Sequence, residues 1–261
     1  MDFGTDEGQH GHGDGGDAAE WKKVAELRAV AEAQDPAAKA PYPTASIYRL
    51  LDSSSARREE DDFVLRRFLC ARDYNIGKAS TMLLQYLAWK RITKPHGSIS
   101  GEEVRDEIVK KRVDMQGFDR LGRPMAYIYG ARHFPAWRDL DGFKPYVAYV
   151  LDKICTRLPV GQEKFVAVID LRGWGYANCD IRGYVAALDI MQSYYPERLG
   201  RVFLIHVPYM FMAAWKMVYP FIDDKTKKKF VFVVDRDLDA TLRDAIDDSQ
   251  LPEEYGGKLK L

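Results

Sequence analysis

The second half of the chain alternates short apolar runs with longer amphipathic stretches. Four runs rich in β-branched and aromatic residues lie at residues 125–129, 165–170, 201–207 and 230–235. Runs such as VFLIHV and FVFVV are apolar without alternation, which is typical of strands covered on both faces. Helical stretches lie between the runs, at residues 143–157, 181–195 and 209–222. Because parallel neighbouring strands need long crossovers, this order predicts an α/β fold with a largely parallel sheet.

Three stretches in the first hundred residues have helical signals, at residues 19–33, 61–73 and 77–91. The third has the i, i+3, i+4, i+7, i+8 spacing of an amphipathic helix, in Ala79, Met82, Leu83, Tyr86 and Leu87. Residues 35–43 contain three prolines and are expected to form a linker. We therefore predict a small helical unit ahead of the α/β unit.

The first 20 residues differ in composition from the rest of the chain. They hold six acidic residues and six glycines, with no lysine or arginine. Such a segment has too little apolar surface to offset the entropy of ordering. A second break lies at residues 94–100, with a proline, a glycine and two serines. The predicted division is a disordered acidic tail at 1–20, a helical domain at 21–97 and an α/β domain at 98–261.

Charge, cysteine content and hydropathy narrow the classes of function. Lysine plus arginine and aspartate plus glutamate each total 39, which gives no case for a nucleic-acid partner. The three cysteines are far apart in sequence, so neither a disulfide framework nor a zinc site is expected. The longest nearly uncharged apolar run has 16 residues, short of the roughly 20 that span a bilayer. With no secretory or mitochondrial targeting pattern at the amino terminus, we expect a cytoplasmic protein.

The common local signatures of enzymes are missing from the sequence. There is no GxxxxGK[ST], GxSxG or HExxH motif. Gly173-Trp174-Gly175 follows a predicted strand, as in a dinucleotide-binding turn. However, the third glycine position is Asn178, and Trp174 would crowd a pyrophosphate. We therefore expect no enzyme activity, no cofactor and no metal, and an oxidoreductase is the weakest hypothesis.

The carboxy-terminal third places an apolar stretch directly before a lysine cluster. YYPERLG at 194–200 leads to HVPYMFMAAWKMVYPFI at 206–222 and then DDKTKKKF at 223–230. A helix that is apolar all round is ordinarily a core helix, and that interpretation remains open. An apolar helix beside lysines also suits a movable lid that meets acyl chains and anionic head groups. Its candidate residues are Phe211, Met212, Trp215, Met217, Val218, Phe221 and Ile222.

Glu197 and Arg198 precede this segment and carry a second signal. A glutamate that pairs with an arginine leaves the guanidinium oriented for a phosphate, and a nearby lysine adds a point charge. The pair and the lysine cluster together indicate an anion site.

These motifs resemble the CRAL-TRIO lipid-binding proteins, and within them the phosphatidylinositol transfer proteins of the secretory pathway. The resemblance covers about residues 60–261. The motifs that carry it are LRRFLCARDYNIGKA (65–79), DRLGRP (119–124), VIDLRG (168–173), YYPERLG, PFID (220–223), TKKK (226–229) and LPEEYGG (251–257). The resemblance implies a pocket floored by the sheet, closed by a gate helix and occupied by one phospholipid.

The resemblance also implies a set of ligand-binding residues at the pocket mouth. The inositol phosphate would be held by Arg72, Asp119, Glu197, Arg198, Thr226 and Lys229. Cys70 and Asp73 stand where the family usually has basic residues, so the mouth is less positive. Phe165 and Ala167, on the pocket strand, stand where the family's phosphatidylcholine site has hydroxyl groups. Phosphatidylcholine binding is therefore not expected.

In addition to the oxidoreductase, the sequence supports two hypotheses from different functional classes. The first is a protein without a bond-making step that binds phosphatidylinositol and either transfers it between membranes or presents it to lipid kinases. It would contact membranes peripherally and transiently. The second is a carrier or sensor of a tocopherol, retinoid or sterol that acts as a ligand-gated scaffold, and Phe165 and Ala167 motivate it.

Overall fold

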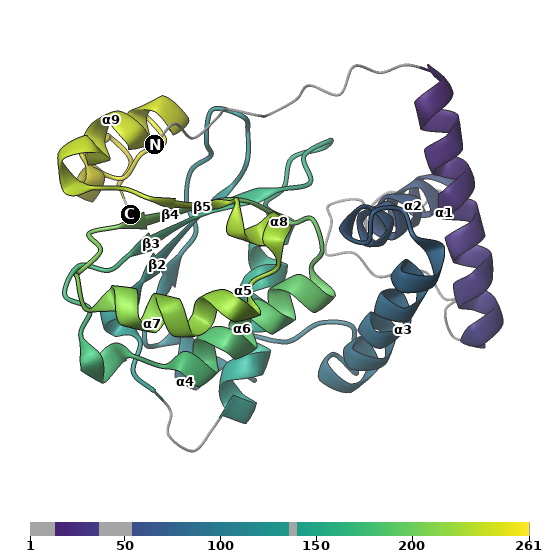
Figure 1. The fold of residues 1–261 in the computed structure, drawn as a ribbon, viewed down its shortest axis with the longest axis horizontal. Coiled ribbons are helices and arrows are strands. Elements are labelled where there is room, and N and C mark those ends of the chain that lie inside the picture. Colours follow the sequence, from purple (N-terminus) through teal and green to yellow (C-terminus); the bar gives the residue numbers. More distant parts are fainter. Residues whose placement is uncertain (1–13, 37–53, 136–139, 261) are drawn as a thin grey trace. The chain divides into compact units, whose positions relative to one another are not determined.

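The computed structural model describes residues 14–36, 54–135 and 140–260 (Figure 1). Contacts divide them into a helical unit, residues 14–36 and 54–85, and an α/β unit, residues 86–135 and 140–260. The α-helices are α1 (Asp14–Gln34), α2 (Ser54–Ala71), α3 (Ile76–Thr93), α4 (Arg105–Ile108), α5 (Leu140–Thr156), α6 (Ile181–Tyr194), α7 (Phe211–Val218), α8 (Asp224–Lys227) and α9 (Leu238–Ala245). The strands are β1 (Val113–Asp114), β2 (Met125–Tyr129), β3 (Phe165–Asp170), β4 (Leu199–Ile205) and β5 (Phe230–Phe232). The 3₁₀ turns are η3 (Gly130–Arg132), η4 (Tyr176–Asn178), η5 (Tyr219–Phe221), η6 (Asp235–Asp237) and η7 (Glu253–Tyr255).

The helical unit contains α1, α2 and the first part of α3. Its apolar side chains form one buried set: Val24, Leu27, Ala31, Val64, Leu65, Phe68, Leu69, Ala79, Met82 and Leu83. Two ion pairs join α1 to α2, from Arg28 to Asp62 and from Arg66 to Glu20, each at 2.6 Å. The two helices are therefore fixed by an apolar stripe with charged pairs beside it.

Both of these helices begin earlier than the sequence pattern predicts. The predicted tail at 1–20 is wrong for residues 14–20, which belong to α1, while residues 1–13 lie outside the described residues. The physical reason is that alanines follow the glycines here and acidic residues favour a helix amino terminus. α2 starts at Ser54 rather than at residue 61, because the intervening alanine, arginines and glutamates are good helix formers.

The α/β unit is built on a five-stranded sheet in the order β1-β2-β3-β4-β5. β2 to β5 are parallel, and β1 adds an antiparallel edge. The predicted α/β class with a largely parallel sheet is confirmed. β2 and β3 have the predicted bounds, whereas β5 ends at Phe232. The helical unit changes to the α/β unit between Gln85 and Tyr86, inside α3, and the predicted boundary at 97/98 stays a prediction.

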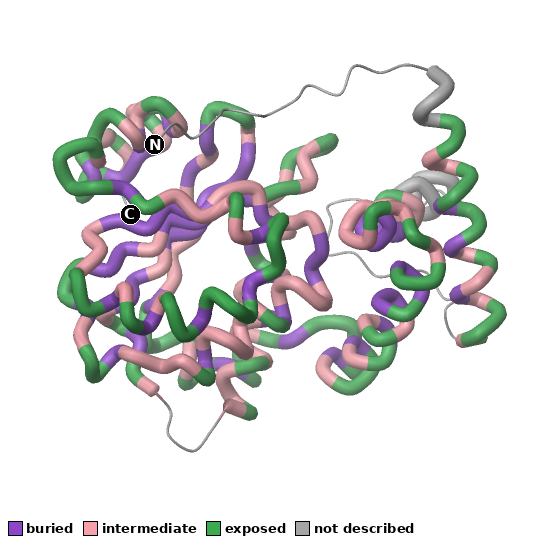
Figure 2. Tube along the Cα trace, in the orientation of Figure 1, coloured by how far each residue is buried: buried purple, intermediate pink, exposed green. Residues whose placement is uncertain are grey.

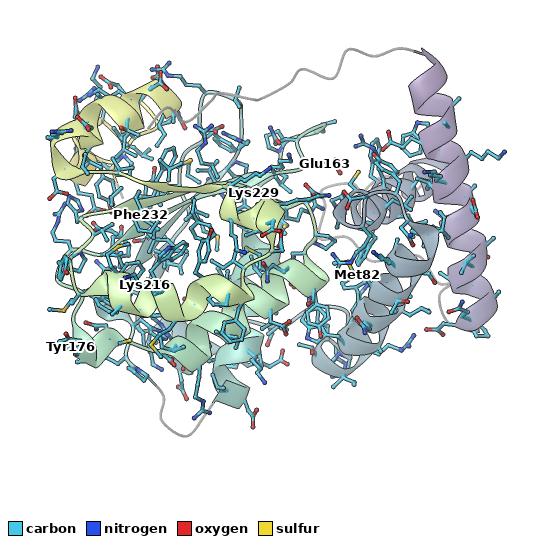
Figure 3. All side chains as sticks on the ribbon, in the orientation of Figure 1. Met82, Glu163, Tyr176, Lys216, Lys229 and Phe232 are labelled. Carbon is cyan, nitrogen blue, oxygen red and sulfur yellow. The ribbon has the colours of Figure 1, made fainter. Side chains whose placement is uncertain are left out.

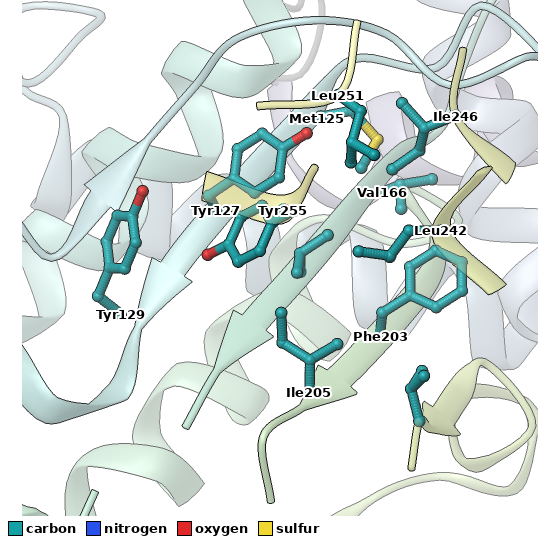
Figure 4. Close-up of a cluster of buried hydrophobic side chains, with 12 residues drawn as sticks. Met125, Tyr127, Tyr129, Val166, Phe203, Ile205, Leu242, Ile246, Leu251 and Tyr255 are labelled. Atoms are coloured by element: carbon teal, nitrogen blue, oxygen red, sulfur yellow. The ribbon is translucent and has the colours of Figure 1, made fainter. Parts of the chain in front are cut away.

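One face of the sheet is closed by α9 and the carboxy-terminal segment (Figures 1 and 4). Alternate strand residues form this core with the last elements of the chain: Met125, Tyr127, Tyr129, Val166, Val168, Phe203, Ile205, Val233, Leu242, Ile246, Leu251 and Tyr255. The rings of Tyr127 and Tyr255 stack, with centroids 5.7 Å apart. The opposite face lies toward α5, α6 and α7, and its covering differs, as described below.

The closed face predicts a strong stability effect at α9. Leu242 is fully buried, so Leu242→Ala should cost about 2–5 kcal/mol of unfolding free energy through lost burial and a residual cavity. Urea unfolding of the full chain, followed by far-UV circular dichroism, measures this change. Leu238→Ala, at a partly buried position on the same helix, is the matched control and should cost less. Equal losses for the two variants would contradict this packing.

Candidate functional site

The second face of the sheet carries two apolar rows that cross the parallel strands. The register aligns Ala126, Ala167, Val202 and Phe230 in one row, and Ile128, Ile169, Leu204 and Phe232 in the next. Ile169 lies on the central strand between two paired neighbours, yet its side chain is only partly buried, like those of Ile128 and Phe230. Phe232 is 39% exposed. This apolar face is therefore incompletely covered, in contrast to the closed face beneath α9.

Phe165 and Ala167 lie at the buried end of this face. Both side chains are 4% exposed and pack with Leu151, Ile154 and Ile190 of the covering helices. Neither side chain carries a hydrogen-bonding group. These two positions therefore offer no hydroxyl group to a phosphate, although the side chains that pack with them include Tyr194 and Tyr195.

The segment at 207–222, which we call the gate segment, covers the incompletely buried rows. It was predicted as one helix over 209–222, which is wrong: α7 ends at Val218 and η5 follows, with Pro220 interrupting the helical hydrogen bonds. Trp215 contacts the sheet edge, with ring centroids 5.0 Å from Phe230 and 5.1 Å from Phe232. The gate segment is thus held on the sheet by edge-to-face contacts between aromatic rings.

The gate segment is amphipathic rather than buried all round. Its buried side chains are Phe211, Ala214, Val218 and Ile222. Exposed apolar side chains include Met217, Tyr219 and Phe221, and Lys216 is exposed beside them. Figure 3 labels Lys216, and Figure 2 shows buried and exposed positions mixed along α7. The core-helix interpretation is therefore wrong, because a core helix would not present three large apolar side chains to solvent. Met212 and Trp215 are partly buried.

Three cationic residues stand directly before three parallel strands. Lys164 precedes β3, Arg198 precedes β4 and Lys229 precedes β5. Because the amino ends of parallel strands meet at one edge of a sheet, these residues share that edge. Backbone hydrogen bonds fix Arg198 and Lys229 in register with the neighbouring strands. Phe165 N donates to Arg198 O, and Val202 N donates to Lys229 O, each at 2.8 Å. Figure 3 shows Lys229 and Glu163 at this end and Tyr176 at the other.

Lys229 is partly buried, with 18% of its side chain exposed. Burial lowers the pKa of Lys229, and the Glu197 carboxylate, 4.0 Å from its Nζ, opposes that shift in part. Lys164 and Lys225 lower the pKa further, so they also lie within electrostatic range. Lys164 was missed at the sequence level. A basic residue directly before two of the predicted strands, at 164 and 229, is the signal that finds it.

The structure gives Glu197 and Arg198 separate partners. Glu197 has a left-handed backbone with φ 58°, and its carboxylate lies toward Lys229. Arg198 Nη1 donates to the carbonyl oxygen of Glu163 at 3.0 Å. The arginine is thus oriented by a backbone carbonyl, and the glutamate by a lysine, rather than the two by each other.

Asp119 and Thr226 are buried turn residues of this edge. Asp119 Oδ1 accepts from the backbone N–H of Arg123 at 2.8 Å, and Oδ2 accepts from Arg123 Nε at 2.7 Å. Thr226 lies in α8, where its N–H donates to Asp223 Oδ1 at 2.8 Å, and its carbonyl accepts from Lys229 N. Asp119 therefore holds Arg123, and Thr226 orients the turn that leads to Lys229.

Arg72 belongs to the helical unit, and its contacts lie within that unit. It follows α2, and its Nη1 donates to the Ala71 carbonyl oxygen at 3.1 Å. Its part in a head-group site stays a prediction. The other five predicted residues, Asp119, Glu197, Arg198, Thr226 and Lys229, come from segments that precede the parallel strands β2, β4 and β5.

A cavity of about 610 Å³ lies beside β1 and is lined by residues of β1, the end of β2, η3 and the carboxy-terminal segment 252–259. None of its lining residues belongs to the gate segment or to the two apolar rows, since Tyr129, its residue from β2, is part of the core on the closed face. The pocket predicted beneath the gate segment is therefore a different place and stays a proposal.

Within the described residues, no group of three or more His, Cys, Asp or Glu side chains is arranged to hold a metal ion. No helix in those same ranges is long and apolar enough to cross a membrane.

The fold and the site define a class of protein in which a parallel sheet carries an incompletely covered apolar face beneath an amphipathic segment, with cations at one edge. Residues 111–257 match the CRAL/TRIO domain, and the chain belongs to that family. It is 29% identical over 210 residues to phosphatidylinositol transfer protein PDR17 of Saccharomyces cerevisiae, covering 74% of this chain and 56% of that protein. It is 30% identical over 217 residues to Patellin-4 of Arabidopsis thaliana, covering 80% and 39%.

The crystal structure of Sfh5 has the same fold, with a TM-score of 0.70 at 18% identity over 94% of this chain and 89% of that chain. Across five curated relatives, the chain spans between 18% and 56% of their length.

The Asp119–Arg123 pair predicts a stability effect at the site edge. Both side chains are buried, so Asp119→Asn leaves the guanidinium without its carboxylate and should cost about 3–5 kcal/mol of unfolding free energy. Urea unfolding measures it, with Asp244→Asn at an exposed position as the control, expected within about 0.5 kcal/mol of wild type. A loss at Asp119 no larger than at Asp244 would show that the pair does not hold this turn.

Proposed function

We propose that this protein binds a phospholipid with an inositol phosphate head group and transfers it between membranes or presents it to lipid-modifying enzymes. One observation carries the proposal: cations precede β3, β4 and β5 at one edge of a sheet whose apolar face is incompletely covered by the gate segment. That juxtaposition suits a molecule with a phosphate at one end and acyl chains at the other. Relatives named as phosphatidylinositol transfer proteins support it.

The energetics explain why such a ligand needs a covered site. A diacyl lipid has about 30 methylenes, and at roughly 0.8 kcal/mol each its exposure to water costs on the order of 25 kcal/mol. The apolar rows and the gate segment replace water as the surroundings of the chains. Affinity then comes mainly from the chains, while the polar edge selects the head group.

Each polar group at the edge has a distinct role toward the head group. Lys229 supplies a positive charge whose burial is costly until an anion arrives, so a phosphate offsets the cost that lowers its pKa. The Glu197 carboxylate accepts hydrogen bonds from inositol hydroxyl groups. Arg198 offers the guanidinium nitrogens that do not bond Glu163, in a geometry matched to phosphate oxygens.

The proposed activity is exchange without a bond-making step, so the protein would be a carrier and not an enzyme. It would act in the cytoplasm and touch membranes transiently through the exposed apolar side chains of the gate segment and the lysines that follow it. Lipid kinases are proposed recipients of the presented lipid. No cofactor is required beyond the lipid itself.

Lys229→Ala tests the proposed head-group site. Loss of one charge-assisted contact should lower phosphatidylinositol transfer between vesicles of otherwise uncharged lipid by about tenfold or more. Lys228→Ala is the matched control, since Lys228 is exposed and adjacent, and it should change the rate by less than about threefold. Circular dichroism verifies that both variants are folded. Normal transfer by Lys229→Ala overturns the site, whereas absence of transfer by the wild type overturns the function.

A second candidate function is favoured by Phe165 and Ala167. These two buried side chains provide no hydrogen-bond donor for a choline lipid's phosphate, which suits a carrier of a tocopherol, retinoid or sterol.

Lipid extracted from the purified full chain and identified by mass spectrometry separates the two functions. The proposed function predicts phosphatidylinositol, with phosphatidylcholine below one tenth of it or so, because the strand offers no hydroxyl group. A prenyl or sterol ligand without phospholipid would favour the second function, and a phosphatidylcholine majority would contradict both.

A further inference from the structure

The gate segment is fixed at both ends by polar side chains of neighbouring elements. At its amino end, His206 follows β4 and contacts Asp170, the last residue of β3. At its carboxyl end, Gln192 of α6 contacts the backbone of Phe221 and Asp223. These two anchors differ in charge, burial and packing, and the difference assigns them different roles.

The amino-terminal anchor is a hydrogen bond to a buried charge. His206 Nδ1 lies 2.9 Å from Asp170 Oδ1, and its Nε2 lies 3.1 Å from Arg172 Nη2. Arg172 Nη2 also lies 3.5 Å from Nδ1, and because a carboxylate can only accept, Nδ1 donates to Asp170. His206 has a left-handed backbone with φ 50°, a conformation that needs support from its surroundings.

The acceptor of that bond is itself fixed. Asp170 is 5% exposed, and its Oδ2 accepts from the Tyr255 hydroxyl at 3.0 Å. Its Oδ1 also accepts from the backbone N–H of Arg172 at 2.8 Å. Next to it, the first residue of α7 packs edge-on against Trp174, with Phe211 and Trp174 centroids 5.2 Å apart. The amino end is therefore held by a charged acceptor and by close aromatic packing.

The carboxy-terminal anchor is neutral and exposed. Gln192 Nε2 donates to the Phe221 carbonyl oxygen at 3.1 Å, and Gln192 Oε1 accepts from Asp223 N at 2.8 Å. Water competes for both bonds. Hydrogen bonds to charged groups are roughly twice as strong as neutral ones, and burial widens the gap. Tyr219 and Phe221 are exposed here, while Val218 and Ile222 are buried. Both of these side chains, and Trp215 with its ring contacts to the sheet, must leave their sites on opening.

We propose that the gate segment pivots at His206 and opens from the end that Gln192 latches. The inference rests on the proposed function and deepens it, because the latched end leads directly into Thr226 and Lys229. The opening would therefore form beside the head-group residues, and the lipid would leave head group first. His206 and Gln192 act as positioning residues for the gate segment.

Hydrogen–deuterium exchange of the full chain tests the direction of opening. Gln192→Met keeps the length of the side chain and removes both bonds, so amides of 219–223 should exchange about tenfold faster, with less than twofold change at 207–212. Gln85→Met, an exposed position, is the matched control and should leave both segments unchanged. Faster exchange at 207–212 than at 219–223, or no change in either, overturns the proposal.

Two substitutions at His206 separate its side-chain bond from its backbone conformation. Glycine and asparagine both accept a positive φ, but only asparagine places a donor nitrogen on Cγ, as the imidazole does. His206→Asn should behave as wild type, and His206→Gly should raise exchange at both ends of the gate segment by about tenfold. Equal behaviour of the two variants would show that the bond to Asp170 is not the pivot.

Lipid exchange measured on the same variants separates this inference from the proposed function. Gln192→Met should speed phosphatidylinositol exchange by several-fold if opening limits the rate. If the wild type carries no phosphatidylinositol, the proposed function fails, while the exchange pattern at 207–212 and 219–223 still decides the pivot.

Discussion

Parallel pairing of β2 to β5 is the constraint on which the rest of this structure depends. In a parallel sheet every strand enters from the same side, so the residues before each strand meet at one edge although they are far apart in sequence. The positions of Arg198 and Lys229 are set by main-chain bonds between strands, from Phe165 N and Val202 N. The charged groups are thus assembled by the sheet and do not need to attract one another, which like charges cannot do.

The two faces of the sheet differ in how completely they are buried. The face beneath α9 is fully buried and closed by the end of the chain, so it can supply cooperative stability. The other face leaves Ile169 partly exposed on the central strand and is covered by a segment held through aromatic edges and a few polar bonds. The opening that we propose needs this asymmetry, because the elements that move must come from the least stable part of the structure.

The sequence predicted the sheet well because the signals were local. Residues 125–129 and 165–170 are apolar runs between helical stretches, and crossover length leaves parallel pairing as the solution. Helix ends were less accurate, since α1 and α2 extend into segments whose polar composition hid good helix formers. The partners at the site were least accurate. The left-handed backbone of Glu197 directs its carboxylate to Lys229, and no residue spacing encodes that turn.

The residues that a resemblance assigns to one ligand divide physically into two kinds. Asp119 has 2% of its side chain exposed and already accepts from Leu121 N, Arg123 N and Arg123 Nε, so its oxygens have little capacity left for a ligand. Its effect must pass through Arg123, which packs against Gly200, where an added Cβ would lie 2.9 Å from Nη1. Lys229 is different, because its carboxylate partner at 4.0 Å lies beyond hydrogen-bond distance. If the proposed function holds, a phosphate would gain most at Lys229, while Asp119 keeps the amino edge of the sheet in register.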